Sequence, residues 1–359
     1  SGQASGRKNL IINGAMQVAQ RGTSATNNGY GSVDRFLCTH EGTDEAVTHA
    51  QVDVASGTTP YSLGLRKSMK LTNGNQTGGV GGADVVGIAQ AIEAQNIATS
   101  GWNFKSSSSY ITLSFWCKSS VAQNFYGYFY IQDGTPKLYS FETGTLTADT
   151  WTKITKKIPG NSDITINVDN GFGLQLQLWT FLGTNYTGTT TLNQWANFDS
   201  SVRTPNFTST WYTTNDSTFE LTGVQLEVGS TATDFEHRSI AEELALCQRY
   251  FQFIGSGFIT AARGASSSMY LYSYTCPVNL RASPTISTNN DLAHGTFSVR
   301  RYRDGSGVSD STTTPATAST YFQVNNNTIH LQQDGFTATD DRSATIFISG
   351  GAITLASEL

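Results

Sequence analysis

The chain has few charged residues. Asp, Glu, Lys and Arg make up 14% of its 359 residues, against about a quarter in an average soluble protein. Acidic residues are in slight excess, so the net charge is -5. A protein with a net negative charge repels the negatively charged phosphate backbone of nucleic acids. We therefore expect no nucleic-acid partner.

Long apolar runs are also missing. A membrane-spanning helix needs about 18 or more consecutive apolar residues, and the sequence has no such run. The first ten residues, SGQASGRKNL, lack the apolar core of a secretory signal. We expect neither membrane insertion nor export by that route.

Motifs for catalysis and metal binding are scarce. The five histidines never fall in HxH or HExxH spacing, and no GxSxG or GxGxxG motif is present. The four cysteines, Cys38, Cys117, Cys247 and Cys276, form no CxxC pair. We predict no enzymatic activity, no cofactor and four buried free thiols. A glycosidase site assembled from distant carboxylates stays open as an alternative.

What the sequence does contain is strand-like alternation. Residues 110–118, 125–131, 172–179 and 219–228 each alternate apolar and polar side chains, as half-buried strands do. Shorter strands are predicted at residues 10–12, 33–38, 63–71, 269–276, 285–288, 296–302, 321–324, 329–331 and 345–349.

One helix is predicted clearly. Ser239 is a capping residue with Glu242 three positions later, which is the pattern of a capping box. Ile240, Leu244, Cys247 and Phe251 then form an apolar stripe that we expect to be buried. A weaker helix is predicted at residues 89–97.

These patterns predict an all-β protein with two sandwich-like domains. The first occupies residues 1–236, the linking helix residues 237–254, and the second, smaller β-sandwich residues 255–359.

Four blocks of the sequence resemble bacteriophage tail-fibre or receptor-binding proteins. They are RKNLIINGAMQVAQRGTS (residues 7–24), VDRF (33–36), FELTGVQLEVGSTATDFEHRSIAEELALCQRYFQ (219–252) and PVNLRASPTIS (277–287). The third block is the specific one. The resemblance implies a carbohydrate-binding jelly roll as the first domain. It also implies a homotrimer that is made in the host cytoplasm and built into the virion with other virion proteins.

The same resemblance raises the question of a structural calcium ion. Related jelly rolls often carry an acidic ligand where this chain has Gln17. Glu227 and Asp234 remain as oxygen ligands, but calcium takes six to eight of them. We therefore predict no cofactor, with calcium as the one exception left open.

An aromatic and amide face is the candidate carbohydrate-binding surface. The alternation places seven side chains opposite the apolar core: Trp116, Tyr126, Tyr128, Tyr130, Gln175, Gln177 and Trp179. Aromatic rings can stack on the C–H face of a sugar while amides bond to its hydroxyl groups. A neutral bacterial surface polysaccharide suits such a face. Alternatively, this face is buried under residues 183–217 or against another subunit.

A second stripe lies in the C-terminal domain, where Tyr270, Tyr272 and Tyr274 alternate and Arg300, Arg301 and Arg303 follow. Either a subunit interface or a ligand site accounts for it.

The sequence thus leads to three hypotheses. The first is a non-enzymatic phage fibre or receptor-binding protein that attaches to a bacterial surface glycan. The second is a capsid decoration or head fibre. The third is a polysaccharide depolymerase or esterase whose site forms between subunits.

Overall fold

The computed structural model describes residues 8–255 and, beyond them, residues 259–266, 269–289, 297–302, 308–311, 322–324, 328–334, 343–348 and 352–359. The chain divides into two compact units. The first holds residues 1–244 with Leu359, and the second holds residues 245–358. The division falls inside the segment 237–254 that the sequence assigns to the linking helix.

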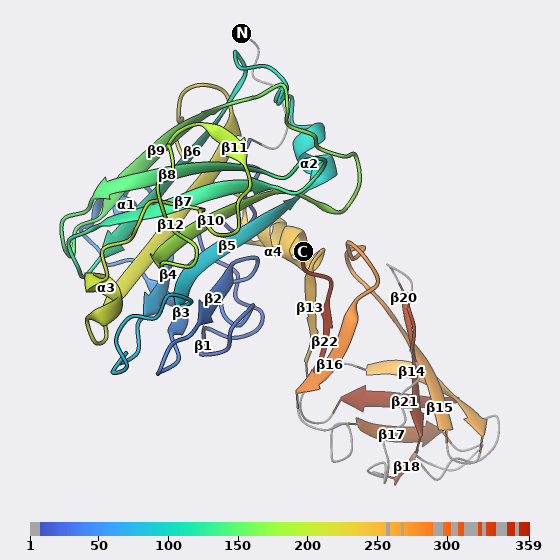
Figure 1. Cartoon of the computed structure of the whole chain (residues 1–359). Coiled ribbons are helices and arrows are strands. Elements are labelled where there is room, and N and C mark those ends of the chain that lie inside the picture. The colour runs from blue at the N-terminus through green and yellow to red at the C-terminus, as the bar shows by residue number, and fades with distance from the viewer. Residues whose placement is uncertain are drawn as a thin grey trace. The chain divides into compact units, whose positions relative to one another are not determined.

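Two six-stranded antiparallel sheets form the N-terminal unit (Figure 1). Sheet A has the strand order β1 (Ser24–Ala25), β3 (Thr48–Asp53), β4 (Lys67–Thr72), β12 (Thr218–Val228), β6 (Tyr110–Ser119), β9 (Thr152–Pro159). Sheet B has the order β11 (Trp195–Asn197), β8 (Lys137–Thr145), β7 (Asn124–Ile131), β10 (Phe172–Leu182), β5 (Val85–Glu93), β2 (Leu37–Glu41).

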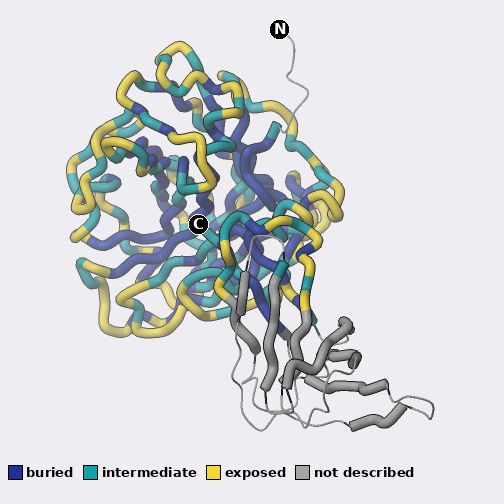
Figure 2. The backbone as a smooth tube through the Cα atoms, turned by 90° about the vertical axis from the view of Figure 1, so that its right-hand side faces the viewer, coloured by how far each residue is buried: buried dark blue, intermediate teal, exposed yellow. Residues whose placement is uncertain are grey.

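The apolar core lies between these two sheets. Leu113 and Phe115 of β6 and Leu174 and Leu176 of β10 are at most 1% exposed and belong to one cluster. Figure 2 shows the buried backbone following the strands while the loops are exposed. The predicted N-terminal jelly-roll β-sandwich is confirmed.

The C-terminal unit is also built from antiparallel strands, as predicted. One sheet has the order β13 (Phe251–Ile254), β22 (Ala352–Ala356), β16 (Thr285–Asn289). The other has the order β18 (Val308–Ser311), β17 (Phe297–Tyr302), β21 (Ser343–Ile348), β14 (Ile259–Ser266), β15 (Met269–Thr275), β20 (Thr328–Asp334), β19 (Phe322–Val324).

Helices are short in the described residues. They are α1 (Thr59–Ser62), α2 (Ala94–Ala98), α3 (Thr210–Thr213) and α4 (Ile240–Gln248). None of them has the length and apolar character needed to cross a membrane.

Some local predictions are wrong. Of the predicted strand at residues 33–38, only Leu37 and Cys38 lie in a strand, β2. The predicted helix at residues 89–97 is mostly the end of β5, and only α2 is helical. All nine residues of β5 are buried, so no alternation marks it as a strand. Residues 10–12 are ordered and buried but do not form a strand. They lead into the predicted Asn13-Gly14 turn, where Asn13 has a φ of 60°.

The cap of α4 is as predicted, and its apolar stripe is buried at Cys247 and Phe251. The Glu242 backbone N–H donates to Ser239 Oγ at 3.2 Å. Ile240, however, is 58% exposed, while Glu243 is only 7% exposed. Glu243 is buried because its Oε1 accepts hydrogen bonds from the Asn13 backbone N–H and the Arg238 guanidinium. The departure from the predicted stripe thus lies in the first turn of the helix, where Glu243 rather than Ile240 is buried.

The four cysteines are buried free thiols, as predicted. Burial raises the pKa of the Cys38 and Cys117 thiols to about 12, so both stay protonated and unreactive near neutral pH.

Candidate functional site

Six of the seven predicted carbohydrate-binding residues share one face of sheet B. Strands β7 and β10 pair directly, with Tyr126 opposite Trp179, Tyr128 opposite Gln177, and Tyr130 opposite Gln175. The alternation in the sequence therefore predicts this grouping correctly.

Trp116 does not belong to that group, and the prediction that all seven project from one side is wrong. Trp116 lies on β6 of sheet A, between Thr222 of β12 and Lys153 of β9. The apolar core separates it from Tyr128 and Trp179. Alternation gives the inward and outward positions of each strand but not the sheet to which the strand belongs.

Residues 183–217, here the covering segment, lie over the aromatic face of sheet B. The rings of Phe198 and Tyr130 are 4.8 Å apart between centroids, and those of Phe207 and Tyr126 are 5.0 Å apart. Beneath them Tyr128 is 1% exposed and Trp179 is 6% exposed. The alternative interpretation, a face buried under its own chain, describes this structure.

Backbone hydrogen bonds hold the covering segment in place. Its strand β11 pairs with β8, and the Asn193 and Phe198 N–H groups donate to the carbonyl oxygens of Ser140 and Pro136. Lys137 Nζ also donates to Asn197 Oδ1 at 2.8 Å. Tyr128 and Trp179 therefore belong to a small satellite core, whereas Tyr126, Tyr130, Gln175 and Gln177 are half-buried.

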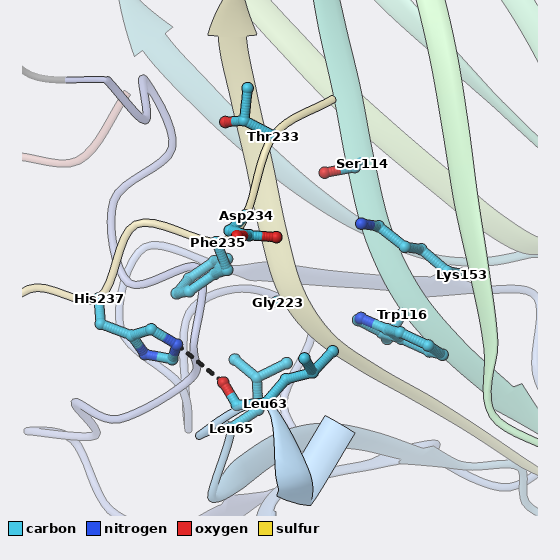
Figure 3. Close-up of a pocket in the computed structure, with 10 residues that line it drawn as sticks. All are labelled: Leu63, Leu65, Ser114, Trp116, Lys153, Gly223, Thr233, Asp234, Phe235 and His237. Carbon is cyan, nitrogen blue, oxygen red and sulfur yellow. Dashed lines mark hydrogen bonds between the residues drawn. The ribbon is translucent and has the colours of Figure 1, made fainter. Parts of the chain in front are cut away.

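Trp116 instead lines a pocket of about 240 Å³ on the outer face of sheet A (Figure 3). Its walls come from β6, β9, β12 and two loops. The lining residues are Leu63, Leu65, Ser114, Trp116, Lys153, Gly223, Thr233, Asp234, Phe235 and His237. In Figure 3 the Asp234 carboxylate points from its loop toward the side of the pocket that carries Lys153 and Trp116.

A β-bulge in β12 opens room for the Trp116 ring. The register of β12 against β6 shifts between Thr222 and Gln225, and Gly223 within the bulge has a φ of 61°. A Cβ at Gly223 would lie 2.8 Å from Leu65 Cδ1 and 3.3 Å from Trp116 Cδ1. Glycine supplies both the positive φ and the space.

The loop that carries Asp234 and Phe235 is fixed from below by a buried carboxylate. Glu227 Oε1 accepts from the Thr233 backbone N–H at 2.8 Å, and Oε2 accepts from Thr233 Oγ1 at 2.7 Å. Glu227 Oε1 also accepts from Gln225 Nε2 at 2.8 Å. These bonds set the wall of the pocket before any ligand arrives.

His237 lies further along the same loop, beside Phe235. Its Nε2 lies 2.9 Å from the Leu63 carbonyl oxygen, and its ring meets Phe235 edge-on at 5.0 Å between centroids. The pocket thus combines an indole ring, an apolar floor, an amine, a carboxylate and a hydroxyl. Such a set can stack on one face of a small polar ring and bond to its rim.

Residues for metal binding are not assembled in the described part of the chain. No three histidine, cysteine, aspartate or glutamate side chains there come together as a metal-binding group. Glu227 is one of the two carboxylates that the sequence offers for calcium. Both of its carboxylate oxygens accept hydrogen bonds, from Thr233 and Gln225. The calcium question itself stays a prediction.

Most of the pocket was not predicted. Of its lining residues, the sequence predicts only Trp116 as a binding residue and offers Asp234 only as a calcium ligand. The one available signal was the segment TATDFEHR (residues 231–238) within the most specific sequence block. In the second predicted stripe, Tyr270, Tyr272 and Tyr274 lie on β15 and Arg300 and Arg301 on β17, whereas Arg303 lies outside the described residues.

No protein-family model matches the chain, and no curated protein sequence matches it. Among solved structures, the chain is similar to the enzymatically active domain of tailspike protein 4 from bacteriophage CBA120. The match covers 62% of this chain and 21% of that one, with 12% identity and a TM-score of 0.34. This chain thus spans about a fifth of that domain.

Two further solved structures are covered almost completely. A putative sugar-binding protein from Bacteroides thetaiotaomicron matches 62% of this chain and 100% of its own, with 11% identity and a TM-score of 0.34. A structure described as CBM4 matches 61% of this chain and 99% of its own, with 12% identity and a TM-score of 0.32. Similarities of this size do not assign a ligand to this chain.

Proposed function

We propose that this protein is a non-enzymatic bacteriophage fibre or receptor-binding component that attaches to a bacterial surface glycan through the Trp116 pocket. The observation that carries the proposal is the pocket itself. A half-buried indole ring lies beside the hydroxyl of Ser114, the amine of Lys153 and the carboxylate of Asp234. The four sequence blocks support the assignment to a phage particle.

The chemistry of the pocket suits a sugar residue. A hexose has an apolar C–H face for Trp116, while its hydroxyl groups both donate and accept hydrogen bonds. Asp234 offers acceptors, Lys153 offers donors and Ser114 offers both. The volume of about 240 Å³ is below the range of about 300–1,000 Å³ usual for drug-sized ligands. We therefore assign it one sugar residue of a longer chain.

Attachment is favoured over hydrolysis by the same lining residues. Glycosidases use two carboxyl groups, about 5 to 9.5 Å apart, whereas Asp234 is the one carboxylate that lines this pocket. His237 directs Nε2 to the Leu63 carbonyl oxygen rather than to a nucleophile. A single weak sugar site becomes durable attachment when three copies act together, because the second and third contacts form at high effective concentration.

Cell binding combined with a mass measurement tests the proposal. We expect the full chain to assemble as a trimer and to label host cells, and Trp116→Ala to weaken labelling about tenfold, the effect of losing about 1.4 kcal/mol. Gln177→Ala, on the outer face of sheet B, is the matched control and is expected to label normally.

Two results would reject the proposal. One is that Trp116→Ala binds cells like the unaltered protein while Gln177→Ala does not. The other is the release of reducing ends or acetate when the protein is incubated with host polysaccharide, which would make it a depolymerase or esterase. Antibodies that place the protein on capsids, without cell labelling, would favour the decoration hypothesis.

A further inference from the structure

The outer face of sheet A carries positive charge, against the trend of the whole chain. On this face the strands β4, β12, β6 and β9 present Lys70, Lys118, Lys153 and Lys157, with Glu220 and Glu227 as acids. The chain overall is acidic, with a net charge of -5. Lysines therefore outnumber carboxylates on these four strands.

Both of these carboxylates already have local partners. Glu220 forms an ion pair with Lys118 at 2.8 Å and accepts a hydrogen bond from Ser68. Glu227 is 4% exposed and bonds to Thr233 and Gln225. Neither carboxylate reaches Lys153 or Lys157, and among the described residues no ion pair forms at either lysine.

Lys153 and Lys157 point outward together with aromatic rings. Along β9, Ile154 and Ile158 face the core while Lys153, Thr155 and Lys157 are exposed. Lys153 lies opposite Trp116, and Lys157 Nζ sits 3.9 Å from the centre of the Tyr110 ring. Lys118 Nζ likewise lies 5.3 Å from the centre of the Trp151 ring.

Three lysines and three aromatic rings thus form a strip along β6 and β9: Tyr110, Trp116, Lys118, Trp151, Lys153 and Lys157. The Trp116 pocket opens within this strip. Lys153 and Lys157 are four residues apart on one face of a strand, which corresponds to roughly 13 Å. The strip is therefore longer than the pocket.

We infer that this strip binds an acidic saccharide chain, one whose sugar residues carry carboxylate or phosphate groups. The inference rests on the proposed function and names the substrate class for the same site. The rings accept the C–H faces of successive sugars, and Lys153 and Lys157 bind their acidic groups. This differs from the neutral polysaccharide that the sequence predicts for the face of sheet B.

Edge protection alone does not account for the strip. β9 is an edge strand, and lysines on edge strands prevent pairing with other chains. That role needs no outward-facing rings, whereas here each of three rings lies beside a lysine. Nucleic acid carries the same kind of anionic groups, and its binding is the competing outcome of the test.

The test compares polymers and lysine variants with the full chain. Polygalacturonate supplies carboxylates, poly(glycerol phosphate) supplies phosphates, dextran is neutral, and poly(dT) is a nucleic acid. We expect at least one of the two acidic probes to bind more tightly than dextran and poly(dT), with affinity falling as salt rises. The preferred probe identifies the acidic group.

The two matched double variants carry the same net charge as each other. Lys153→Gln/Lys157→Gln is expected to weaken binding of the acidic probe about fivefold, the sum of two exposed charge contacts. Lys67→Gln/Lys105→Gln removes the same charge elsewhere on the unit and is expected to have no effect. Equal losses of affinity in both double variants would mean that only the net charge matters, and this would overturn the inference.

Other outcomes also decide. Tighter binding of dextran, equal binding of poly(dT), no binding of either acidic probe, or a Lys153→Gln/Lys157→Gln variant that binds unchanged would each overturn the inference. Aggregation of that variant without loss of affinity would assign the lysines to edge protection. If Trp116→Ala still binds the acidic probe and host cells, the proposed pocket fails while the strip stands. If only the lysine variants bind normally, the strip fails while the pocket stands.

Discussion

The outer faces of the two sheets of the N-terminal unit differ in how far other parts of the chain cover them. Sheet B carries a row of aromatic and amide side chains, and the chain folds residues 183–217 over them, so Tyr128 and Trp179 are buried. Sheet A carries fewer rings, and the loop that crosses it leaves a pocket beside Trp116. The face with more rings is largely covered by its own chain, and the face with fewer rings carries the pocket.

Charge separates the two faces as well. Strands β7 and β10 contain no Lys, Arg, Asp or Glu, whereas β6 and β9 contain Lys118, Lys153, Lys156 and Lys157. Uncharged polar groups can be covered when they are hydrogen-bonded, but charged amines are costly to cover. The lysines therefore keep sheet A exposed, while the amides of sheet B tolerate a cover.

The largest expected effect comes from removing the central ring of the covered face. Trp179→Ala should lower the free energy of unfolding by about 3–5 kcal/mol, as for other buried Trp residues. The Trp179 ring packs over Gly87, where even a Cβ would lie 2.4 Å from Trp179 Cε3, so the cavity cannot refill easily. Urea unfolding gives the measurement.

Trp116→Ala is the matched substitution on the open face and should cost far less stability, because the ring is only partly buried. Similar losses for the two tryptophans would contradict the division into a structural and an open face. So would a stable Trp179→Ala protein that no longer binds cells.

Much of this fold follows from alternation in the sequence, but the assignment of strands to sheets does not. Residues 110–118, 125–131 and 172–179 are strands with the predicted faces. Trp116 and Tyr126 look equivalent in such a pattern, yet they lie on different sheets because β6 pairs with β9 and β12 while β7 pairs with β8 and β10. Long-range pairing decides this, and a local pattern does not contain it.

The pocket was hidden for a related reason. Leu63, Trp116, Lys153 and Asp234 come from four distant parts of the sequence. The β-bulge at Gly223 makes room for the Trp116 ring, and in the sequence the glycine itself is the only sign of this bulge. Glu227 suggested a calcium ligand from its residue type, while its actual partners are Thr233 and Gln225. The C-terminal stripe at β15 and β17 remains a prediction.

A glycine comparison tests whether the bulge shapes the open face. Gly223→Ala should cost about 2 kcal/mol, because a positive φ disfavours alanine and the new Cβ would press on Leu65. Gly144→Ala on β8 of sheet B is the control, since Gly144 has a φ of 76° and no heavy atom within 4 Å of the added Cβ. That variant should cost about 1 kcal/mol from backbone strain alone.

Urea unfolding measures both costs, and binding to host cells measures the pocket. We expect only Gly223→Ala to weaken cell binding as well. Equal costs in the two variants, with binding intact in both, would mean that the bulge does not shape the pocket.

The smallest effect at neutral pH is the pH dependence of the free energy of unfolding. A group over sheet A should lose its stabilising contribution in acid, and a group on sheet B should lose its contribution in alkali. Glu236 lies in the loop over sheet A. Burial tends to raise its pKa, but hydrogen bonds from the Asn9 and Lys8 backbone N–H groups and the Arg238 guanidinium outweigh this and lower the pKa below 4.5. A lowered carboxyl pKa adds stability above pH 4.5, and that stability is lost as the pH falls through the folded value.

On sheet B the corresponding group is a phenol. Burial raises the pKa of Tyr128 from 10.0 to about 12, so its stabilising contribution is complete below pH 10 and is lost as the pH rises toward 12. Tyr139, in the core between the sheets, behaves alike, since burial also raises its pKa to about 12. Urea midpoints from pH 3 to pH 11 should therefore fall at both ends. Glu236→Gln should flatten only the acid side and Tyr128→Phe only part of the alkaline side. If Glu236→Gln leaves the fall of the urea midpoint at low pH unchanged, the acid sensitivity arises outside the loop over sheet A. The two faces would then differ in cover and charge but not in their response to pH.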